Sequence, residues 1–245
     1  MKFILKNIFG IFAASVFAVT LILVIPCYFI VFQFSSKERA PHLAHRIISR
    51  NWARLLFPFF AIKLKIEGME KLKEDETYVF IANHRSQLDI PAFAVATKHT
   101  FRFLAKEELT KIPLLGYVIR KLYISVNRKD KVARARSMDR MMQSIKDGIS
   151  VFICPEGTRN KTDVPLLDFR DGAFRLAIAA QVPLAPMVII GSDKLLSPKH
   201  PVALSTGTLV CRWADPIPTK GLTESDLPQL KEKARLVMLE MLNEN

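Results

Sequence analysis

A histidine and an aspartate stand five residues apart in the segment Asn83–Asp89, and their chemistry suits proton transfer. The segment follows an apolar stretch that we expect to be a strand, so His84 and Asp89 lie in the connection to the next helix. A carboxylate bonded to one imidazole nitrogen fixes the tautomer and raises the basicity of the other nitrogen, which can then take a hydroxyl proton. A structural interpretation stays open, in which Asp89 caps the helix beginning at Ile90.

A second polar cluster, Pro155–Arg159, follows another apolar stretch. The guanidinium of Arg159 is a planar fork that matches phosphate oxygens, Thr158 adds a neutral donor, and Gly157 permits close approach of the backbone to a ligand. The alternative is a surface turn held together by Glu156 and Arg159. Because sites in α/β sheets form at strand ends, the two clusters favour one shared site.

Strand-like and helix-like segments alternate around these clusters. Short apolar runs predict buried strands, and apolar residues at helical spacing predict helices. The predicted strands are residues 78–82, 101–104, 122–126, 149–154, 184–190 and 209–213, and the predicted helices are residues 131–146, 172–181 and 226–242. We therefore expect an α/β fold with a mixed central sheet flanked by helices.

The N-terminal segment has the composition of a membrane anchor. Residues 7–36 carry no charge, and residues 8–34 form an apolar run long enough to cross the hydrocarbon layer and longer than the core of a cleaved signal peptide. Residues 42–60 then place Arg46, Arg50 and Arg54 on one helical face, with Ile48, Trp52 and Leu55 opposite. This amphipathic helix either lies in a lipid interface or packs on its own domain. The predicted domains are therefore 1–60, the membrane-anchoring helices, and 61–245, the catalytic domain.

Composition narrows the choice of partners. The chain has 245 residues, half of them hydrophobic, and a formal net charge of +13, of which residues 1–60 contribute +6. Such charge favours an anionic partner. Nucleic acid is disfavoured because the charge lies beside an apolar anchor and no aromatic-basic motif is present. Three dispersed cysteines favour a reducing compartment without disulfides, and no Cys/His spacing suggests a metal or a cofactor.

Four blocks of sequence together resemble the glycerolphosphate acyltransferase superfamily, specifically the 1-acylglycerol-3-phosphate acyltransferases of the bacterial inner membrane. The Asn-His-x4-Asp block matches at Asn83, His84 and Asp89, and the Pro-Glu-Gly-Thr-Arg block matches fully at residues 155–159. A block between them falls on residues 122–128 and keeps Arg128, but it has Leu122 and Ser125 where Gly and Phe are usual. The last block matches at residues 182–186.

The resemblance implies direct transfer of an acyl group from acyl-CoA or acyl-ACP, the co-substrate, to the sn-2 hydroxyl of lysophosphatidic acid, giving phosphatidic acid. His84 would be the general base and Asp89 its orienting partner. The substrate-binding residues would be Arg128, Arg159, Glu156, Gly157, Thr158 and, as a further cationic contact, Lys106. The arginines would bind the acceptor phosphate, and Glu156 would hold glycerol or a neighbouring arginine. The implied location is the bacterial inner membrane, with the catalytic domain on the cytoplasmic side.

Two other functions stay open at this point. The departures at Leu122 and Ser125 lie in the block that helps to define the acceptor pocket, so another lyso-lipid is an alternative acceptor. A non-catalytic lipid-binding protein at the membrane surface is the second alternative, since it needs only charge and apolar area. The intact His84 and Asp89 pair argues against it.

Overall fold

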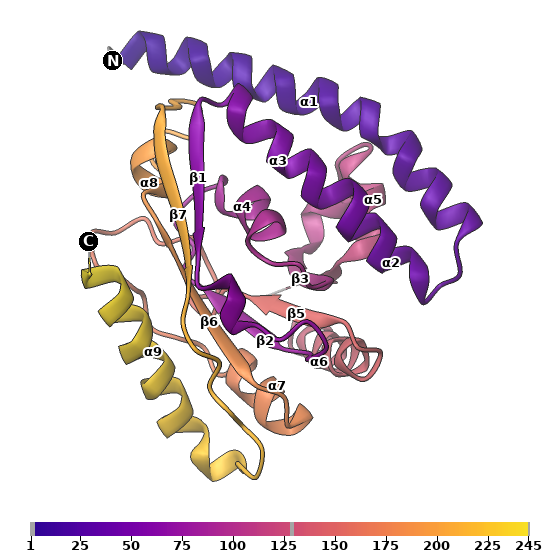
Figure 1. The fold of residues 1–245 in the computed structure, drawn as a ribbon, viewed down its shortest axis with the longest axis vertical. Helices are drawn as coiled ribbons and strands as arrows, with labels where there is room; N and C mark the ends of the chain where they lie inside the picture. Colours follow the sequence, from indigo (N-terminus) through magenta and orange to yellow (C-terminus); the bar gives the residue numbers. More distant parts are fainter. Residues whose placement is uncertain (1–2, 128–129, 245) are drawn as a thin grey trace.

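The computed structural model describes residues 3–127 and 130–244, and within these residues seven strands form one mixed sheet (Figure 1). The strand order is β1-β7-β6-β2-β5-β3-β4. Strands β6, β2, β5, β3 and β4 run parallel, β7 is antiparallel to β6, and β1 is parallel to β7. The strands are β1 (Ile62–Glu67), β2 (Val79–Ala82), β3 (Phe101–Lys106), β4 (Ile124–Val126), β5 (Ser150–Ile153), β6 (Leu184–Ile190) and β7 (Gly207–Trp213).

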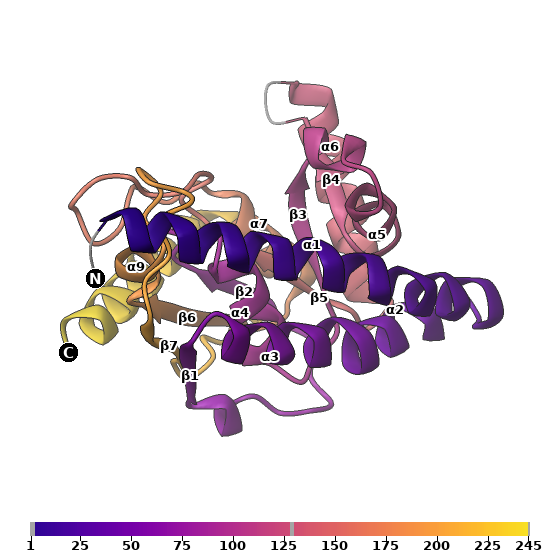
Figure 2. The ribbon, with the colours of Figure 1, turned by 90° about the horizontal axis from the view of Figure 1, so that it is seen from above.

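Helices cover both faces of the sheet (Figures 1 and 2). One face carries α1 (Phe3–Phe34), α3 (Arg50–Phe59) and α4 (Asp89–Ala96), with α5 (Leu115–Leu122) beside α1. The other face carries α6 (Lys131–Lys146), α7 (Gly172–Ala180) and α9 (Leu227–Asn243). Shorter helices are α2 (Arg39–Leu43), the π-helix η1 (Ala44–Ser49), α8 (Ser192–Leu195) and the 3-10 turns Met69–Lys71, Glu107–Lys111 and Glu224–Asp226.

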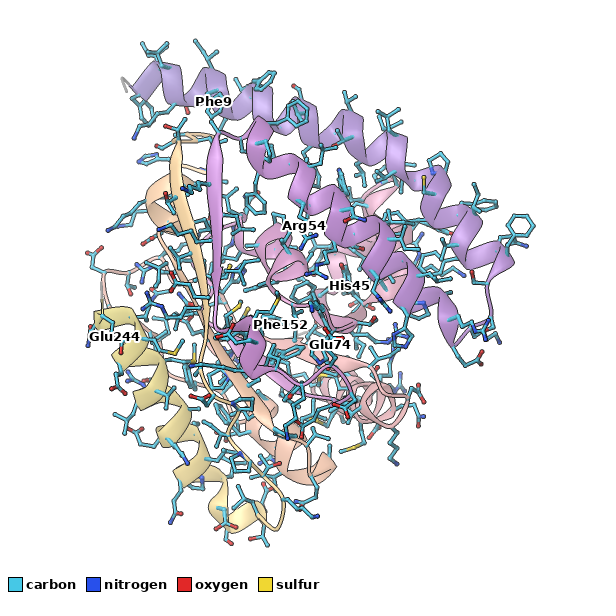
Figure 3. All side chains as sticks on the ribbon, in the orientation of Figure 1. Phe9, His45, Arg54, Glu74, Phe152 and Glu244 are labelled. Carbon is cyan, nitrogen blue, oxygen red and sulfur yellow. The ribbon has the colours of Figure 1, made fainter. Side chains whose placement is uncertain are left out.

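Aromatic side chains fill the core beneath α3 and α4. Phe152 of β5 lies at its centre (Figure 3), where its ring packs against those of Phe80, Phe93, Phe101 and Phe103. Such ring contacts stabilise the fold beyond the burial of apolar area alone. The three strands that carry four of these rings, β2, β5 and β3, are therefore fixed relative to one another, and so are the loops that follow them.

The carboxyl ends of four parallel strands lie at one edge of the sheet. Ile81 pairs with Ile153 between β2 and β5, Phe103 pairs with Phe152 between β3 and β5, and Lys106 pairs with Val126 between β3 and β4. Because neighbouring strands lie about 4.8 Å apart, the residues that follow these strands meet at this edge.

Helix α1 packs lengthwise on the domain and does not stand away from it (Figures 1 and 2). Near its start, the carbonyl oxygen of Lys6 accepts a hydrogen bond from the backbone N–H of Leu204, at 3.1 Å. Near its middle, Nε1 of Trp52 in α3 donates to Oγ1 of Thr20, at 2.9 Å, and its last turns contact α5. In the described part of the chain, α1 is the helix long and apolar enough to cross a membrane, and most of its surface is exposed.

The predicted fold class is confirmed, with differences in detail. Strand β1 and helix α5 were not predicted, and the predicted strand at residues 122–126 was wrong at its start, because Leu122 ends α5 and the strand begins at Ile124. Val118, Ile119 and Leu122 form a buried stripe at helical spacing, which accounts for the helix. The amphipathic helix is present as α2, η1 and α3, but Leu55, grouped with Ile48 and Trp52, is 54% exposed. The proposed boundary at residue 60 stays a prediction.

The imidazole of His45 in η1 is buried against the sheet without a polar partner (Figure 3). Its ring lies edge-on to that of Phe101, with 4.4 Å between centroids, and neither nitrogen has a hydrogen-bond partner among the described residues. Burial, reinforced by nearby Arg50, lowers the pKa of His45 to about 3. The ring is therefore neutral in the folded chain near physiological pH.

We predict that His45 makes the protein less stable in mild acid. In the unfolded chain His45 takes up a proton as the pH falls below its ordinary pKa of 6.5, whereas in the folded chain it does so only near pH 3. Stability is therefore lost as the pH falls through this window. At pH 5 the loss amounts to about 2 kcal/mol. His45→Leu should lose less stability than wild type when thermal unfolding in detergent is compared at pH 7 and pH 5. An equal loss in both proteins would contradict the assignment.

Candidate active site

A single carboxylate oxygen of Asp89 organises the turn between β2 and α4. Oδ2 of Asp89 is 2.8 Å from Nδ1 of His84, and it accepts hydrogen bonds from the backbone N–H groups of Arg85 and Ser86, each at 2.8 Å. Asp89 is fully buried as the first residue of α4, whose N-terminus favours a negative charge. Its bonds go to the preceding turn, so Asp89 does not act as the N-cap of α4.

The His84 imidazole is held on one edge and accessible on the other. Its side chain is 19% exposed, and Nε2 has no hydrogen-bond partner among the described residues. With Asp89 ionised, Nδ1 carries the proton that it donates to Oδ2, and the Nε2 lone pair faces outward. This arrangement can accept a proton from a hydroxyl group at Nε2 while the carboxylate stabilises the resulting imidazolium.

Backbone hydrogen bonds join the two polar clusters into one site. The backbone N–H of His84 donates to Oε1 of Glu156 at 3.0 Å, and the N–H of Asn160 donates to the carbonyl oxygen of His84 at 2.7 Å. The loop after β5 is therefore fixed to the loop after β2 on both sides of the histidine backbone. The predicted meeting of the clusters at one sheet edge is present in the structure.

Glu156 occupies a different position from the one expected of a substrate ligand. It is 3% exposed, and while Oε1 accepts from His84, Oε2 accepts from the backbone N–H of Leu167 at 2.8 Å. Burial raises the pKa of the Glu156 carboxyl, although these two amides oppose that rise. Both oxygens of Glu156 therefore bind backbone amides of the site loops. The geometry does not favour the expected role, in which Glu156 holds glycerol or a neighbouring arginine.

The other predicted substrate-binding residues differ in their surroundings. Gly157 has a φ of +70°, a left-handed conformation that favours glycine, Thr158 is exposed, and Arg159 is half-buried. Lys106 ends β3 at the same sheet edge, but its Nζ lies 3.1 Å from Oε1 of Glu108, and both side chains are largely exposed. Arg128 lies outside the described residues, so its role stays a prediction.

Arg85 is a residue of the site that the sequence did not single out. Its Nε donates to Oδ2 of Asp193 at 2.8 Å, its Nη1 to the carbonyl oxygen of Val164 at 2.9 Å, and its Nη2 to that of Thr162 at 2.8 Å. The guanidinium therefore connects the His84 turn to the segment 160–167 and to α8. Its neighbour Asn83 plays a similar part, since its side chain exchanges two hydrogen bonds with the backbone of Ile189.

We predict that Arg85→Gln loosens the segment 160–167. Glutamine cannot supply the three donor directions, and each lost bond to a charged donor weakens local structure by about 1.5 to 3 kcal/mol. Hydrogen exchange at these amides should become faster, while exchange in β2 and β5 should not change. Arg175→Gln, which breaks only the exposed ion pair with Glu224, is the control. Unchanged exchange in Arg85→Gln would show that the guanidinium does not hold the segment.

Comparison with known proteins identifies the family of this chain. Residues 63–190 match the sequence model of the family described as Acyltransferase. The 1-acyl-sn-glycerol-3-phosphate acyltransferase of Saccharomyces cerevisiae is 30% identical over 208 residues, which are 83% of this chain and 67% of that protein. A chloroplastic 1-acyl-sn-glycerol-3-phosphate acyltransferase of Arabidopsis thaliana is 34% identical over 62% of this chain and 42% of its own length.

A solved structure shares the whole fold. The crystal structure of the 1-acyl-sn-glycerophosphate (LPA) acyltransferase PlsC from Thermotoga maritima has a TM-score of 0.83 to this chain and covers 100% of it and 98% of that chain, at 24% sequence identity. The resemblance of the sequence blocks is confirmed by the family match and by the yeast relative. This chain belongs to the acyltransferase family.

Proposed function

We propose that this protein transfers an acyl group from acyl-CoA or acyl-ACP to the sn-2 hydroxyl of 1-acylglycerol-3-phosphate, with His84 as the general base. The observation that carries the proposal is the 2.8 Å contact between His84 Nδ1 and Asp89 Oδ2, in a turn bonded to the Pro155–Arg159 loop. The acceptor is inferred from the yeast and Arabidopsis relatives, which are 1-acyl-sn-glycerol-3-phosphate acyltransferases.

In the proposed reaction, His84 Nε2 takes the proton as the acceptor oxygen attacks the carbonyl carbon of the thioester. The C–O bond forms, the tetrahedral intermediate collapses, and the C–S bond breaks. The imidazolium returns the proton to the departing thiolate, so the histidine ends the cycle neutral. Asp89 holds the ring in one tautomer throughout, and alignment of the two bound lipids supplies a further part of the acceleration. This route uses no acyl-enzyme, metal or cofactor.

A lipid-facing surface supports the proposed acceptor. The helices α1 to α3 expose many large apolar side chains, a pattern that marks interaction sites. On α1 these include Ile4, Ile8, Ile11, Phe12, Val19, Ile22, Leu23, Phe29, Ile30 and Phe34, and after α1 they include Leu43, Ile47, Leu55 and Phe59. Since the catalytic pair lies on the same sheet face as these helices, a lyso-lipid in the interface would reach it from the membrane.

We further propose that α1 lies along the membrane surface and does not cross the bilayer alone. A crossing helix would carry the loop around Leu204 and the start of α3, to which it is bonded, into the hydrocarbon, where their exposed backbone groups would lose water. The bacterial inner membrane and its cytoplasmic side remain the proposed location.

The His84→Ala variant tests the catalytic assignment. Loss of a general base should lower the transfer rate by at least about 100-fold, while sedimentation with vesicles should stay at the level of wild type. His200→Ala, in an exposed loop, is the matched control and should transfer normally. Turnover of His84→Ala equal to that of wild type would rule out His84 as the base. Absence of transfer by both proteins would favour the lipid-binding alternative.

A panel of lyso-lipids tests the acceptor. Purified protein with a labelled acyl thioester should acylate lysophosphatidic acid faster than lyso-phospholipids with a larger headgroup, because the guanidinium of Arg159 would bind a phosphomonoester more strongly than a singly charged phosphodiester. The same assay with acyl-CoA and acyl-ACP in competition identifies the donor. Failure with lysophosphatidic acid, together with transfer to another lyso-lipid, would refute the proposed acceptor and keep the reaction.

A further inference from the structure

The side chain of Arg170 lies directly over Gly157 of the second cluster. A Cβ atom added to Gly157 would be 2.5 Å from Nε and 2.7 Å from Cδ of Arg170, closer than non-bonded atoms approach. The backbone of the two segments is also in register, because the N–H of Arg170 donates to the carbonyl oxygen of Pro155 at 2.8 Å. Gly157 is thus needed for its positive φ and also for the space that the arginine side chain occupies.

The guanidinium of Arg170 has neither an ion pair nor a hydrogen bond among the described residues. Other basic side chains around the site differ: Arg85 pairs with Asp193, and Lys106 pairs with Glu108. Arg170 is also exposed. An arginine packed against backbone loses less side-chain freedom on binding than one that is free in solvent, so it is better placed to bind an anion.

We propose that Arg170 binds a phosphate group of one of the two substrates, on a floor formed by the backbone of Gly157. This inference rests on the proposed acyl transfer for the identity of the substrates. Both carry a suitable group, since the acceptor ends in a phosphomonoester and the acyl donor has a phosphate on its pantetheine arm. Arg159 follows Gly157 by two residues, and the side chain of Arg170 lies over Gly157, so the two guanidinium groups would together favour a doubly charged phosphomonoester.

Equilibrium binding in detergent tests the proposal without requiring turnover. The ligands are lysophosphatidic acid, coenzyme A and monoacylglycerol, which lacks the phosphate, and the proteins are wild type, Arg170→Gln, Arg170→Lys and the control Arg175→Gln. Arg170→Gln should bind one phosphate ligand about tenfold or more weakly, and Arg170→Lys should recover part of that loss. Monoacylglycerol binding and the Arg175→Gln control should stay within about twofold of wild type.

The ligand that is lost identifies the source of the phosphate. Weaker binding of lysophosphatidic acid alone assigns Arg170 to the acceptor, and weaker binding of coenzyme A alone assigns it to the donor. Unchanged binding of both, or an equal loss of monoacylglycerol, would overturn the proposal. If wild type binds through Arg170 but transfers no acyl group, the proposed function fails and the phosphate site stands.

A double-mutant cycle tests whether the arginine acts from its place over Gly157. Gly157→Ala should displace the guanidinium and weaken binding of the same phosphate ligand, but it should have little further effect in the Arg170→Gln background. Strain from the positive φ is present in both backgrounds and cancels in the cycle. Additive losses of ligand affinity would show that Arg170 does not depend on its contact with Gly157.

Discussion

One oxygen atom of a buried carboxylate sets the geometry on which the account depends. Oδ2 of Asp89 accepts from the His84 ring and from two backbone amides, so the imidazole cannot rotate without breaking a network that also shapes the turn. The two amides and the start of α4 stabilise a negative charge on this buried carboxylate. In the proposed reaction that charge would stabilise an imidazolium on His84.

The parallel strands supply the second constraint. Four of them end at one edge of the sheet, and aromatic packing around Phe152 fixes their relative positions. Glu156 and Arg85 then bind the loops to one another through side chains whose partners are mostly backbone atoms. A site built in this way holds its geometry through the fold. Among the described residues the guanidinium of Arg170 has no ion pair or hydrogen bond, which sets it apart from Arg85.

Much of this arrangement could be predicted from local pattern. Buried strands appear as short apolar runs, and two polar clusters directly after such runs predict a shared edge. Long-range partners could not be predicted. The bond from Arg85 to Asp193 joins residues more than a hundred positions apart, and the contact between Gly157 and Arg170 depends on how one loop returns. Strand β1 (Ile62–Glu67) is the outermost strand on one side of the sheet, and charged residues alternate along it. It therefore lacks the apolar run from which the other strands were predicted.

The tautomer of His84 is the most direct test of the central claim. Nitrogen-15 NMR of the histidine-labelled protein in detergent, with His84 assigned from the signals that vanish in His84→Gln, reports which ring nitrogen carries the proton. We expect protonated Nδ1 and unprotonated Nε2 near neutral pH, as the bond to an ionised Asp89 requires. A ring protonated only at Nε2 would contradict the account, because that nitrogen could not then accept a proton from the acceptor hydroxyl.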